Sequence, residues 1–263
     1  MKKYFVIGNP INHSLSPILH NHWIKKNSID AVYEKKLANN EDLENIIYQI
    51  GQNYIHGINI TVPFKNDVIK FIDQLSPEAE ATQSVNTIYL NEGQIIGHNT
   101  DIAGFQLSLN KIKYNVQGKK IFILGAGGVV PSLIFALNKM KASSIIISNR
   151  TKEKALKLKK TFTNIEIYDW GNIPYFDLII NATSVGLNIG DTIDLDFSKI
   201  ENNKLFYDVI YNPEETNFLK LGKKLGNNTE NGKMMFVYQA HQAFTIWHKV
   251  MPEIDDEVMK ILK

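Results

Sequence analysis

The stretch KKIFILGAGGVVPS, residues Lys119 to Ser132, decides the fold that we predict for this chain. Its apolar run Ile121–Leu124 is short and rich in β-branched residues, which is typical of a buried parallel strand, and it stops at Gly125-Ala126-Gly127-Gly128. A helical pattern follows from Leu133 onward. A strand, a glycine turn and a helix in this order aim backbone N–H groups and the positive end of a helix at a pyrophosphate. The stretch therefore predicts a dinucleotide-binding turn.

The glycines matter because a Cβ atom would block the close approach of a phosphate. The third position of a G-x-G-x-x-G pattern falls on Val130, and Pro131 is tolerated only because the first helical turn needs no N–H at that point. A bare glycine motif also occurs in turns that bind nothing, so the setting between a strand and a helix carries the prediction.

Further strands continue the same alternation of strand and helix as far as Leu225. We expect them at residues 145–147, 165–168, 177–181 and 205–210, with an amphipathic helix after the last one. Strands that alternate with helices in this way predict a doubly wound parallel sheet.

The strand at residues 145–147 ends at Ser148-Asn149-Arg150-Thr151, where a dinucleotide fold reads the adenosine ribose. A carboxylate there would repel a 2′-phosphate, whereas Asn149 and Arg150 accept one, so NADP is preferred over NAD. Thr151 and Lys154 could add a hydroxyl and a charge, although a lysine in a lysine-rich helix is equally a solvated surface residue.

Composition narrows the classes of function. The chain has 263 residues, 44% of them hydrophobic, with a net charge of only +2 and no cysteine. It could form one domain or two, and nothing in the charge argues for a nucleic acid or an anionic membrane as partner. No disulfide, thiolate site or membrane-spanning stretch is expected, so a cytoplasmic location is the default. The histidines are dispersed, with His20 and His22 on different sides of one helix, so no metal site is expected.

The N-terminal segment INHSLSP carries two serines before Pro17 opens a helix. Ser16 could simply cap that helix, with Ser14 in a polar turn. Alternatively, the two hydroxyls and the free N–H groups of the first helical turn form a seat for a carboxylate.

The segment HGINITVPFK predicts a half-buried strand over residues 58–62, with Lys65 just beyond its end. A lysine at such a place is usually solvated. We expect a helix over Phe64–Leu75, and then a hairpin whose three-residue loop is Asn91-Glu92-Gly93.

A polar cluster is expected around this hairpin, made of Asn86, Thr87 and the run Asn99-Thr100-Asp101. These residue types are also ordinary turn and cap residues, and Asp101 could simply start the helix that continues to Leu109. Near the end of the chain, a long helix over Met234–Lys249 would place Gln239 and Gln242 on one face.

Taken together, these segments resemble the shikimate dehydrogenase family over essentially the whole chain. The resemblance rests on nine motifs in order: HSLSP (13–17), NITVPFK (59–65), SVNT (84–87), HNTD (98–101), GAGG (125–128), NRT (149–151), ATSVG (182–186), DVIYNPEET (208–216) and QAHQAF (239–244). It implies an α/β protein of two domains. A substrate-binding domain would span residues 1–101, rejoined by C-terminal helices over 236–263, and a Rossmann-type NADP domain would span 102–235.

The resemblance implies NADPH-dependent reduction of 3-dehydroshikimate to shikimate, a step of aromatic amino-acid biosynthesis. Lys65 and Asp101 would be the catalytic pair, and Ser14 and Ser16 would hold the substrate carboxylate. The other substrate-binding residues implied are Thr61, Asn86, Tyr211, Gln239 and Gln242. The cofactor-binding residues implied are Gly125, Ala126, Gly127, Gly128, Val129, Asn149, Arg150, Thr151, Lys154, Thr183 and Gly232.

The sequence departs from the family at Val130, at Pro131 and at Lys154, where an arginine is common and would grip a phosphate with two donors instead of one. One alternative is a quinate/shikimate dehydrogenase that uses NAD, which the paired serines and Asn149-Arg150-Thr151 argue against. Another is a non-catalytic NADP-binding regulator, which intact Lys65 and Asp101 argue against. Shikimate or 3-dehydroshikimate is the expected small-molecule partner, and the chain would act as a monomer or a homodimer.

Overall fold

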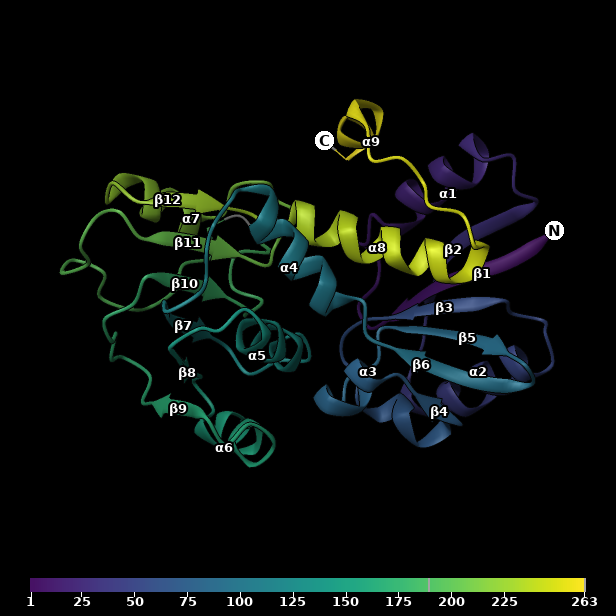
Figure 1. Cartoon of the computed structure of the whole chain (residues 1–263), viewed down its shortest axis with the longest axis horizontal. Helices are drawn as coiled ribbons and strands as arrows, with labels where there is room; N and C mark the ends of the chain where they lie inside the picture. Colours follow the sequence, from purple (N-terminus) through teal and green to yellow (C-terminus); the bar gives the residue numbers. More distant parts are fainter. Residues whose placement is uncertain (189, 263) are drawn as a thin grey trace. The chain divides into compact units, whose positions relative to one another are not determined.

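The computed structural model describes residues 1–188 and 190–262. Contacts between Cα atoms divide the chain into two compact units, and each is described separately. Unit 1 comprises Met1–Gly104 and Val237–Lys263, and unit 2 comprises Phe105–Phe236. Helices α4 (Asp101–Lys111) and α8 (Lys233–His248) each have residues in both units (Figure 1).

Unit 1 is built on a mixed six-stranded sheet with the order β2-β1-β3-β5-β6-β4. Strand β1 pairs in parallel with β2 and β3, and β5 pairs antiparallel with β3 and β6. The other elements of this unit, with their bounds, are β1 (Lys2–Gly8), α1 (Ser16–Lys26), β2 (Ala31–Leu37), η1 (Asn40–Asp42), α2 (Leu43–Gly51), β3 (Gly57–Ile60), η2 (Asp67–Phe71), β4 (Gln74–Leu75), α3 (Pro77–Thr82), β5 (Thr87–Asn91), β6 (Gln94–His98) and α9 (Asp256–Ile261).

Both faces of this sheet are covered, as its apolar strands require. Because successive side chains of a strand point to opposite faces, Ile7 and Ile58 pack with the apolar face of α2, which carries Leu43, Ile46, Ile47 and Ile50. On the other face, Tyr4 contacts the ring of Trp247 from α8. The two layers fix the strand ends from which the candidate site residues project.

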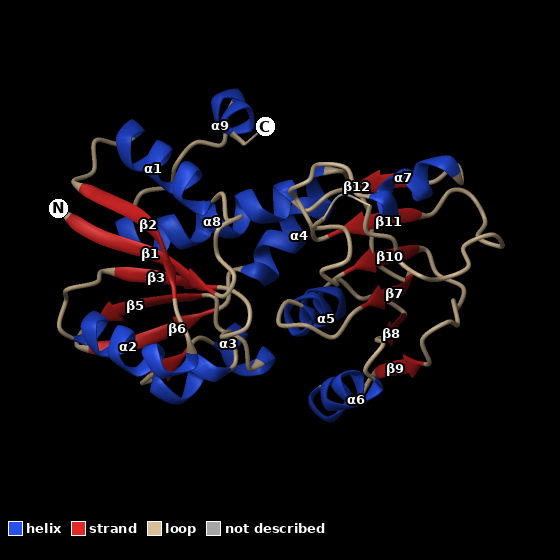
Figure 2. Ribbon diagram, turned by 180° about the vertical axis from the view of Figure 1, so that it is seen from behind, coloured by secondary structure: helices blue, strands red, loops and turns tan. Residues whose placement is uncertain are grey.

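Unit 2 is an all-parallel sheet with the order β12-β11-β10-β7-β8-β9, drawn in red in Figure 2. Counted along the chain this is the 3-2-1-4-5-6 order of the Rossmann fold, so the predicted doubly wound sheet is confirmed. The elements are β7 (Lys120–Leu124), α5 (Val130–Lys139), β8 (Ser144–Ser148), α6 (Lys152–Thr161), β9 (Ile165–Tyr168), β10 (Leu178–Asn181), β11 (Leu205–Asp208), α7 (Asn217–Lys224) and β12 (Asn228–Glu230).

The helix predicted over Phe64–Leu75 is wrong. The structure has the short 3-10 helix η2 in this segment, followed by β4, which pairs in parallel with β6. The backbone around β4 finds its partners in β6, since Asp73 N–H donates to Ile95 O and Ser76 N–H donates to Gly97 O. Those long-range bonds outweigh the local helical preference.

Two smaller predictions also need correction. The hairpin loop has two residues, not three, because Asn91 pairs with Gln94 and both Glu92 and Gly93 have positive φ, as a type I′ turn requires. Strand β3 is shorter than residues 58–62 and all of it is buried, so it is not half-buried. Among residues 1–188 and 190–262, no helix combines the length and the apolar character that a membrane crossing needs.

Candidate active site

Lys65 and Asp101 form a buried ion pair in unit 1. Lys65 lies in the turn after β3, Asp101 is the first residue of α4, and the Lys65 ammonium donates a hydrogen bond to Asp101 Oδ2. The two residues are only 8% and 5% exposed. Lys65 is therefore not the solvated lysine that its place after a strand would suggest. A pair held this far from water keeps a defined geometry, because neither group can exchange its partner for solvent.

Asn86 connects this pair to the polar cluster of the hairpin. Its Nδ2 donates to Asp101 Oδ1 at 2.9 Å, and its Oδ1 accepts from the backbone N–H of Thr100 at 2.8 Å. Asn99 also fixes the backbone of Asp101, since its Oδ1 accepts from the Asp101 N–H at 3.1 Å. Asp101 does begin a helix, yet the expected cluster is also present and buried around its carboxylate.

The two N-terminal serines face each other at the start of α1. Ser14 Oγ donates to Ser16 Oγ at 3.2 Å and accepts from the Ser16 backbone N–H at 3.3 Å. Leu15 occupies the N-cap position without a side-chain cap, so Ser16 does not cap the helix as the alternative interpretation supposed. The Ser16 N–H is already engaged by Ser14, so the two hydroxyls at the helix start are the groups that an anion could contact here.

Thr61, Gln239 and Gln242 belong to the same unit and are all half-buried. Thr61 follows β3, and its methyl group fills the place that a Cβ on Gly8 would occupy, only 2.4 Å away. The two glutamines lie on α8. Tyr211, in contrast, belongs to unit 2, where its ring stacks on Phe236 with centroids 4.4 Å apart.

The glycine turn of unit 2 leaves room for a ligand. Gly125 has a φ of +114°, and a Cβ there would meet Ala182 O at 2.7 Å, so the fold itself requires this glycine. Gly127 is exposed, and a Cβ there would have no neighbour closer than Ala182 O at 3.9 Å. Nothing in residues 1–188 and 190–262 explains why Gly127 lacks a side chain, whereas a phosphate resting on the turn would.

The turn before α5 is accessible at its surface. Val129 is the N-cap of α5 and makes no side-chain cap, and the Val130 N–H donates to Gly127 O at 3.0 Å within the turn. Ala126, Gly127, Gly128 and Val129 are all partly or fully exposed. The residues present therefore fit the pyrophosphate of a dinucleotide.

The end of β8 presents positive charge. Asn149 Nδ2 donates to Thr151 O at 2.8 Å, which fixes the turn, while Arg150, Thr151 and Lys154 are exposed. Lys152 pairs with Asp169 at 2.6 Å, but no carboxylate of the described part of the chain pairs with Arg150 or Lys154. These two cations remain available to a 2′-phosphate.

Sequence reasoning missed a buried carboxylate next to Thr183. Asp208 has no exposed surface, and its oxygens accept from Thr216 Oγ1 at 2.6 Å, Ile210 N–H at 3.0 Å and Asn181 Nδ2 at 3.1 Å. Burial raises the pKa of Asp208 to about 6. Asn181 Oδ1 in turn accepts from the Thr183 hydroxyl at 2.7 Å, so Asp208 braces the loop that holds Thr183. The only signal in the sequence was an Asp at a strand end, eight residues before a Thr.

Gly232 is buried for a reason that lies within unit 2. A Cβ there would lie 2.1 Å from Val209 O, and the Gly232 N–H donates to Ile210 O at 3.0 Å. Close backbone packing therefore accounts for this glycine. Its assignment to the cofactor stays a prediction.

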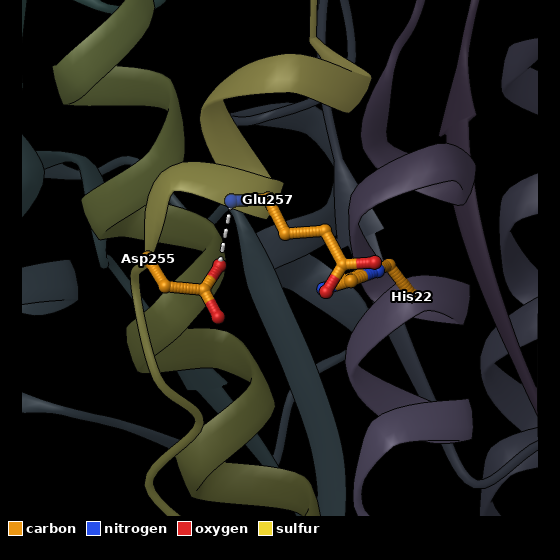
Figure 3. A group of neighbouring side chains, drawn as sticks. All are labelled: His22, Asp255 and Glu257. Atoms are coloured by element: carbon orange, nitrogen blue, oxygen red, sulfur yellow. Dashed lines mark hydrogen bonds between the residues drawn. The ribbon is translucent and has the colours of Figure 1, made fainter.

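One group of potential metal ligands does exist in unit 1. His22 of α1 lies near Asp255 and Glu257 at the start of α9 (Figure 3), with one ligand atom of each within 4.8 Å of the others. Asp255 is already engaged, because Lys26 donates to one oxygen at 2.5 Å and two backbone N–H groups donate to the other. A metal ion would have to displace the Lys26 ammonium, so this group does not support a metal site.

Comparisons with known proteins bear on both units. Residues 6–88 match the family pattern described as shikimate dehydrogenase substrate binding domain, and residues 106–214 match the one described as shikimate / quinate 5-dehydrogenase. The chain is 59% identical to the shikimate dehydrogenase (NADP(+)) of Pelagibacter ubique, over 100% of this chain and 99% of that protein. The chain belongs to the shikimate dehydrogenase family.

Solved shikimate dehydrogenases have the same fold. The enzyme of Aquifex aeolicus superposes with a TM-score of 0.90 at 35% identity, covering 100% of this chain and 97% of the other. A shikimate dehydrogenase of Thermus thermophilus in complex with NADP(H) and shikimate gives a TM-score of 0.90 at 29% identity, covering 100% and 98%. The two-domain α/β architecture expected from the family resemblance is thus confirmed.

Proposed function

We propose that this shikimate dehydrogenase reduces 3-dehydroshikimate to shikimate with NADPH, reversibly, as a step of aromatic amino-acid biosynthesis. The observation that carries the proposal is the buried Lys65–Asp101 pair, held by Asn86 in a chain that belongs to this family throughout its length. The same proposal assigns residues 1–101 and 236–263 to substrate binding and residues 102–235 to NADP binding. It places the enzyme in the cytoplasm, as a monomer or a homodimer.

The substrate is a ring that carries a carboxylate and several oxygens. Ser14 and Ser16 hold the carboxylate through their hydroxyls at the start of α1. Thr61, Asn86 and Gln242 hydrogen-bond the ring oxygens, and Gln239 and Tyr211 are the further residues that this proposal assigns to the substrate. Amide and hydroxyl groups both donate and accept hydrogen bonds, which suits a ring that carries hydroxyls and a ketone.

Lys65 supplies the proton of the reduction. When bound, NADPH supplies a hydride to the ketone carbon. As the carbon is reduced, negative charge develops on the ketone oxygen, and the Lys65 ammonium stabilises that charge and donates a proton to it. Asp101 holds the ammonium in place through its Oδ2, and Asn86 holds Asp101 through Oδ1. In the reverse direction Lys65 accepts the proton from the substrate hydroxyl.

The cofactor is held by backbone groups and by two cations. The turn Gly125-Ala126-Gly127-Gly128 with Val129 binds the pyrophosphate, and Asn149, Arg150, Thr151 and Lys154 bind the 2′-phosphate. Thr183 and Gly232 would hold the nicotinamide half. Exposed Arg150 without a carboxylate partner in the described chain favours NADP over NAD, which argues against the rival NAD-dependent quinate/shikimate dehydrogenase. A non-catalytic NADP-binding regulator would not need a buried Lys65–Asp101 pair.

Steady-state kinetics of the full chain test this function. We expect kcat/KM for shikimate to be higher with NADP than with NAD, and higher for shikimate than for quinate. Arg150→Ala should raise KM for NADP roughly tenfold and leave KM for NAD unchanged, since one charge-assisted phosphate contact is lost. Equal turnover of quinate, a preference for NAD, or cofactor binding without turnover would reject the proposal. Lys152→Ala is the matched control, because Lys152 is already paired with Asp169.

A further inference from the structure

A line of buried side chains connects β2 to the candidate catalytic carboxylate. The hydroxyl of Tyr33 donates to Asn59 Oδ1 at 2.6 Å, and Asn59 Nδ2 donates to Thr87 Oγ1 at 3.1 Å. Thr87 Oγ1 donates to Asn86 Oδ1 at 3.0 Å, and Asn86 Nδ2 donates to Asp101 Oδ1 at 2.9 Å. All five residues are buried and belong to unit 1. They form what we call the Tyr33–Asp101 chain.

The chemistry of its members gives the Tyr33–Asp101 chain a single direction. A carbonyl oxygen can only accept, so Tyr33 has to donate to Asn59 Oδ1. The amide group of Asn59 then faces Thr87, whose own hydrogen is directed at Asn86 Oδ1. The NH2 group of Asn86 is thereby left facing Asp101, whose ionised carboxylate only accepts. Thr100 holds the Asn86 amide in the same orientation, since its N–H donates to Asn86 Oδ1 and its Oγ1 accepts from Asn86 Nδ2 at 2.9 Å, so the buried network specifies a single arrangement.

Two backbone contacts support the same arrangement. Asn59 Nδ2 also donates to the carbonyl oxygen of Asn86 at 3.0 Å, and the Thr100 N–H donates to Asn86 Oδ1. Loss of the Thr87 hydroxyl therefore leaves Asn59 bonded to Tyr33 and to the Asn86 carbonyl, and Asn86 bonded to Thr100 and Asp101. The fold should survive such a loss, while the orientation of Asn86 becomes less strictly defined.

Tyr33, the first residue of the Tyr33–Asp101 chain, is held by two aromatic residues that do not belong to that hydrogen-bonded chain. The Tyr33 ring stacks on His20, with centroids 4.2 Å apart and planes 2° from parallel, and it lies beside Trp247. Tyr33 is 1% exposed and His20 has no exposed surface. The Tyr33 ring is thus held by α1 on one side and by α8 on another, which fixes the position of its oxygen beside Asn59.

We propose that Tyr33 and Thr87 are positioning residues for the reaction, which set the orientation of Asn86 and, through it, of the Asp101 carboxylate. Neither residue has to contact the substrate in this role. The inference rests on the proposed function, because it assigns Asn86 and Asp101 to substrate and to Lys65. It adds Tyr33, which lies outside the family motifs, and it gives a role to Thr87, a motif residue to which the resemblance assigned none.

Three substitutions at two positions test the proposal with shikimate and NADP. Thr87→Val keeps the shape and removes the hydroxyl, and Thr87→Ser restores it. Tyr33→Phe keeps the ring stacked on His20. We expect kcat to fall roughly five- to twentyfold in Thr87→Val and in Tyr33→Phe, with KM within about threefold of wild type. Thr87→Ser should recover most of kcat.

Tyr4→Phe is the matched control. Tyr4 is a buried tyrosine of the neighbouring strand, it contacts Trp247, and it is not a member of the Tyr33–Asp101 chain. Its kcat should equal that of wild type. The double variant Tyr33→Phe/Thr87→Val should lose no more than Thr87→Val alone, since both changes break the same line of bonds. A purely structural role would instead lower the melting temperature and leave kcat of the folded enzyme unchanged.

Three results would overturn the proposal. These are a kcat of Thr87→Val within twofold of wild type, a Thr87→Ser variant no better than Thr87→Val, and losses in the double variant that multiply. If Tyr33→Phe fails to fold, the kcat values of Thr87→Val and Thr87→Ser still test the proposal. Failure of the proposed function is distinct, because wild type itself would then show no NADP-linked turnover of shikimate.

Discussion

Asp208 is a fully buried carboxylate whose oxygens accept hydrogen bonds from a hydroxyl, an amide and a backbone N–H. Desolvation is the largest influence on it and raises its pKa from 3.8 to about 6. The folded protein therefore binds this proton more readily than the unfolded chain does. It follows that the contribution of Asp208 to stability is present below about pH 4 and is lost as the pH rises through about 6.

Asp208→Asn should remove this dependence on pH. Between pH 7 and pH 4, we expect the unfolding free energy of wild type to gain roughly 2 kcal/mol relative to the variant. Urea denaturation of the two proteins across this range measures the difference, in which all other titrating groups cancel. Parallel curves for wild type and variant would contradict the assignment.

At the scale of the element, the turn between β7 and α5 contains one glycine that the fold requires and one that only a bound ligand would require. Gly125 is required by the fold, because its φ is positive and a Cβ would meet a backbone oxygen of Ala182. Gly127 meets nothing closer than 3.9 Å, so the fold tolerates a methyl group there. Only a ligand that rests on the turn would exclude that methyl group.

This contrast predicts opposite outcomes for two substitutions. Gly127→Ala should keep the melting temperature of wild type within a few degrees and raise KM for NADP at least tenfold, because the methyl group occupies phosphate space. Gly125→Ala should lower the melting temperature clearly, since both conformation and space oppose it. Thermal denaturation without cofactor and steady-state kinetics separate the two effects. An unchanged KM in Gly127→Ala would be evidence against pyrophosphate binding at this turn.

The elements that could be predicted are those whose signal is local. The run Ile121–Leu124 followed by glycines fixed β7 and the start of α5, and the same alternation revealed the strands of unit 2 up to β11. The segment 64–75 could not be predicted, because its backbone pairs with β6 more than twenty residues later. Strand β12 has three residues and is defined by its pairing with β11, so a hydrophobic periodicity in the sequence could not predict it.

The candidate site also contains residues that local motifs predict and residues whose roles depend on long-range contacts. Ser14, Ser16, Lys65 and Asp101 lie in short motifs that could be found from the sequence. Asp208, Tyr33 and Asn59 could not be assigned, because their roles depend on burial and on partners from other strands. The burial of Lys65 also had to come from the structure, since lysines after strands are mostly solvated.

At the scale of the whole molecule, the two units carry different parts of one reaction under the proposed function. The ion pair belongs to unit 1, and the glycine turn and Arg150 belong to unit 2. Measurements of turnover therefore need the full chain, while cofactor binding by the Gly127 and Arg150 variants reports on unit 2.

The central claim is that Lys65 donates the proton, and kcat of Lys65→Met measured with 3-dehydroshikimate and NADPH tests it most directly. Methionine keeps an unbranched stem as far as the ε-carbon and removes the ammonium. Lys70→Ala, a change at an exposed lysine of the same unit, serves as control. We predict that kcat of Lys65→Met falls about a thousandfold with KM within a few fold of wild type. A folded Lys65→Met enzyme that kept kcat within tenfold of the Lys70→Ala control would contradict the account.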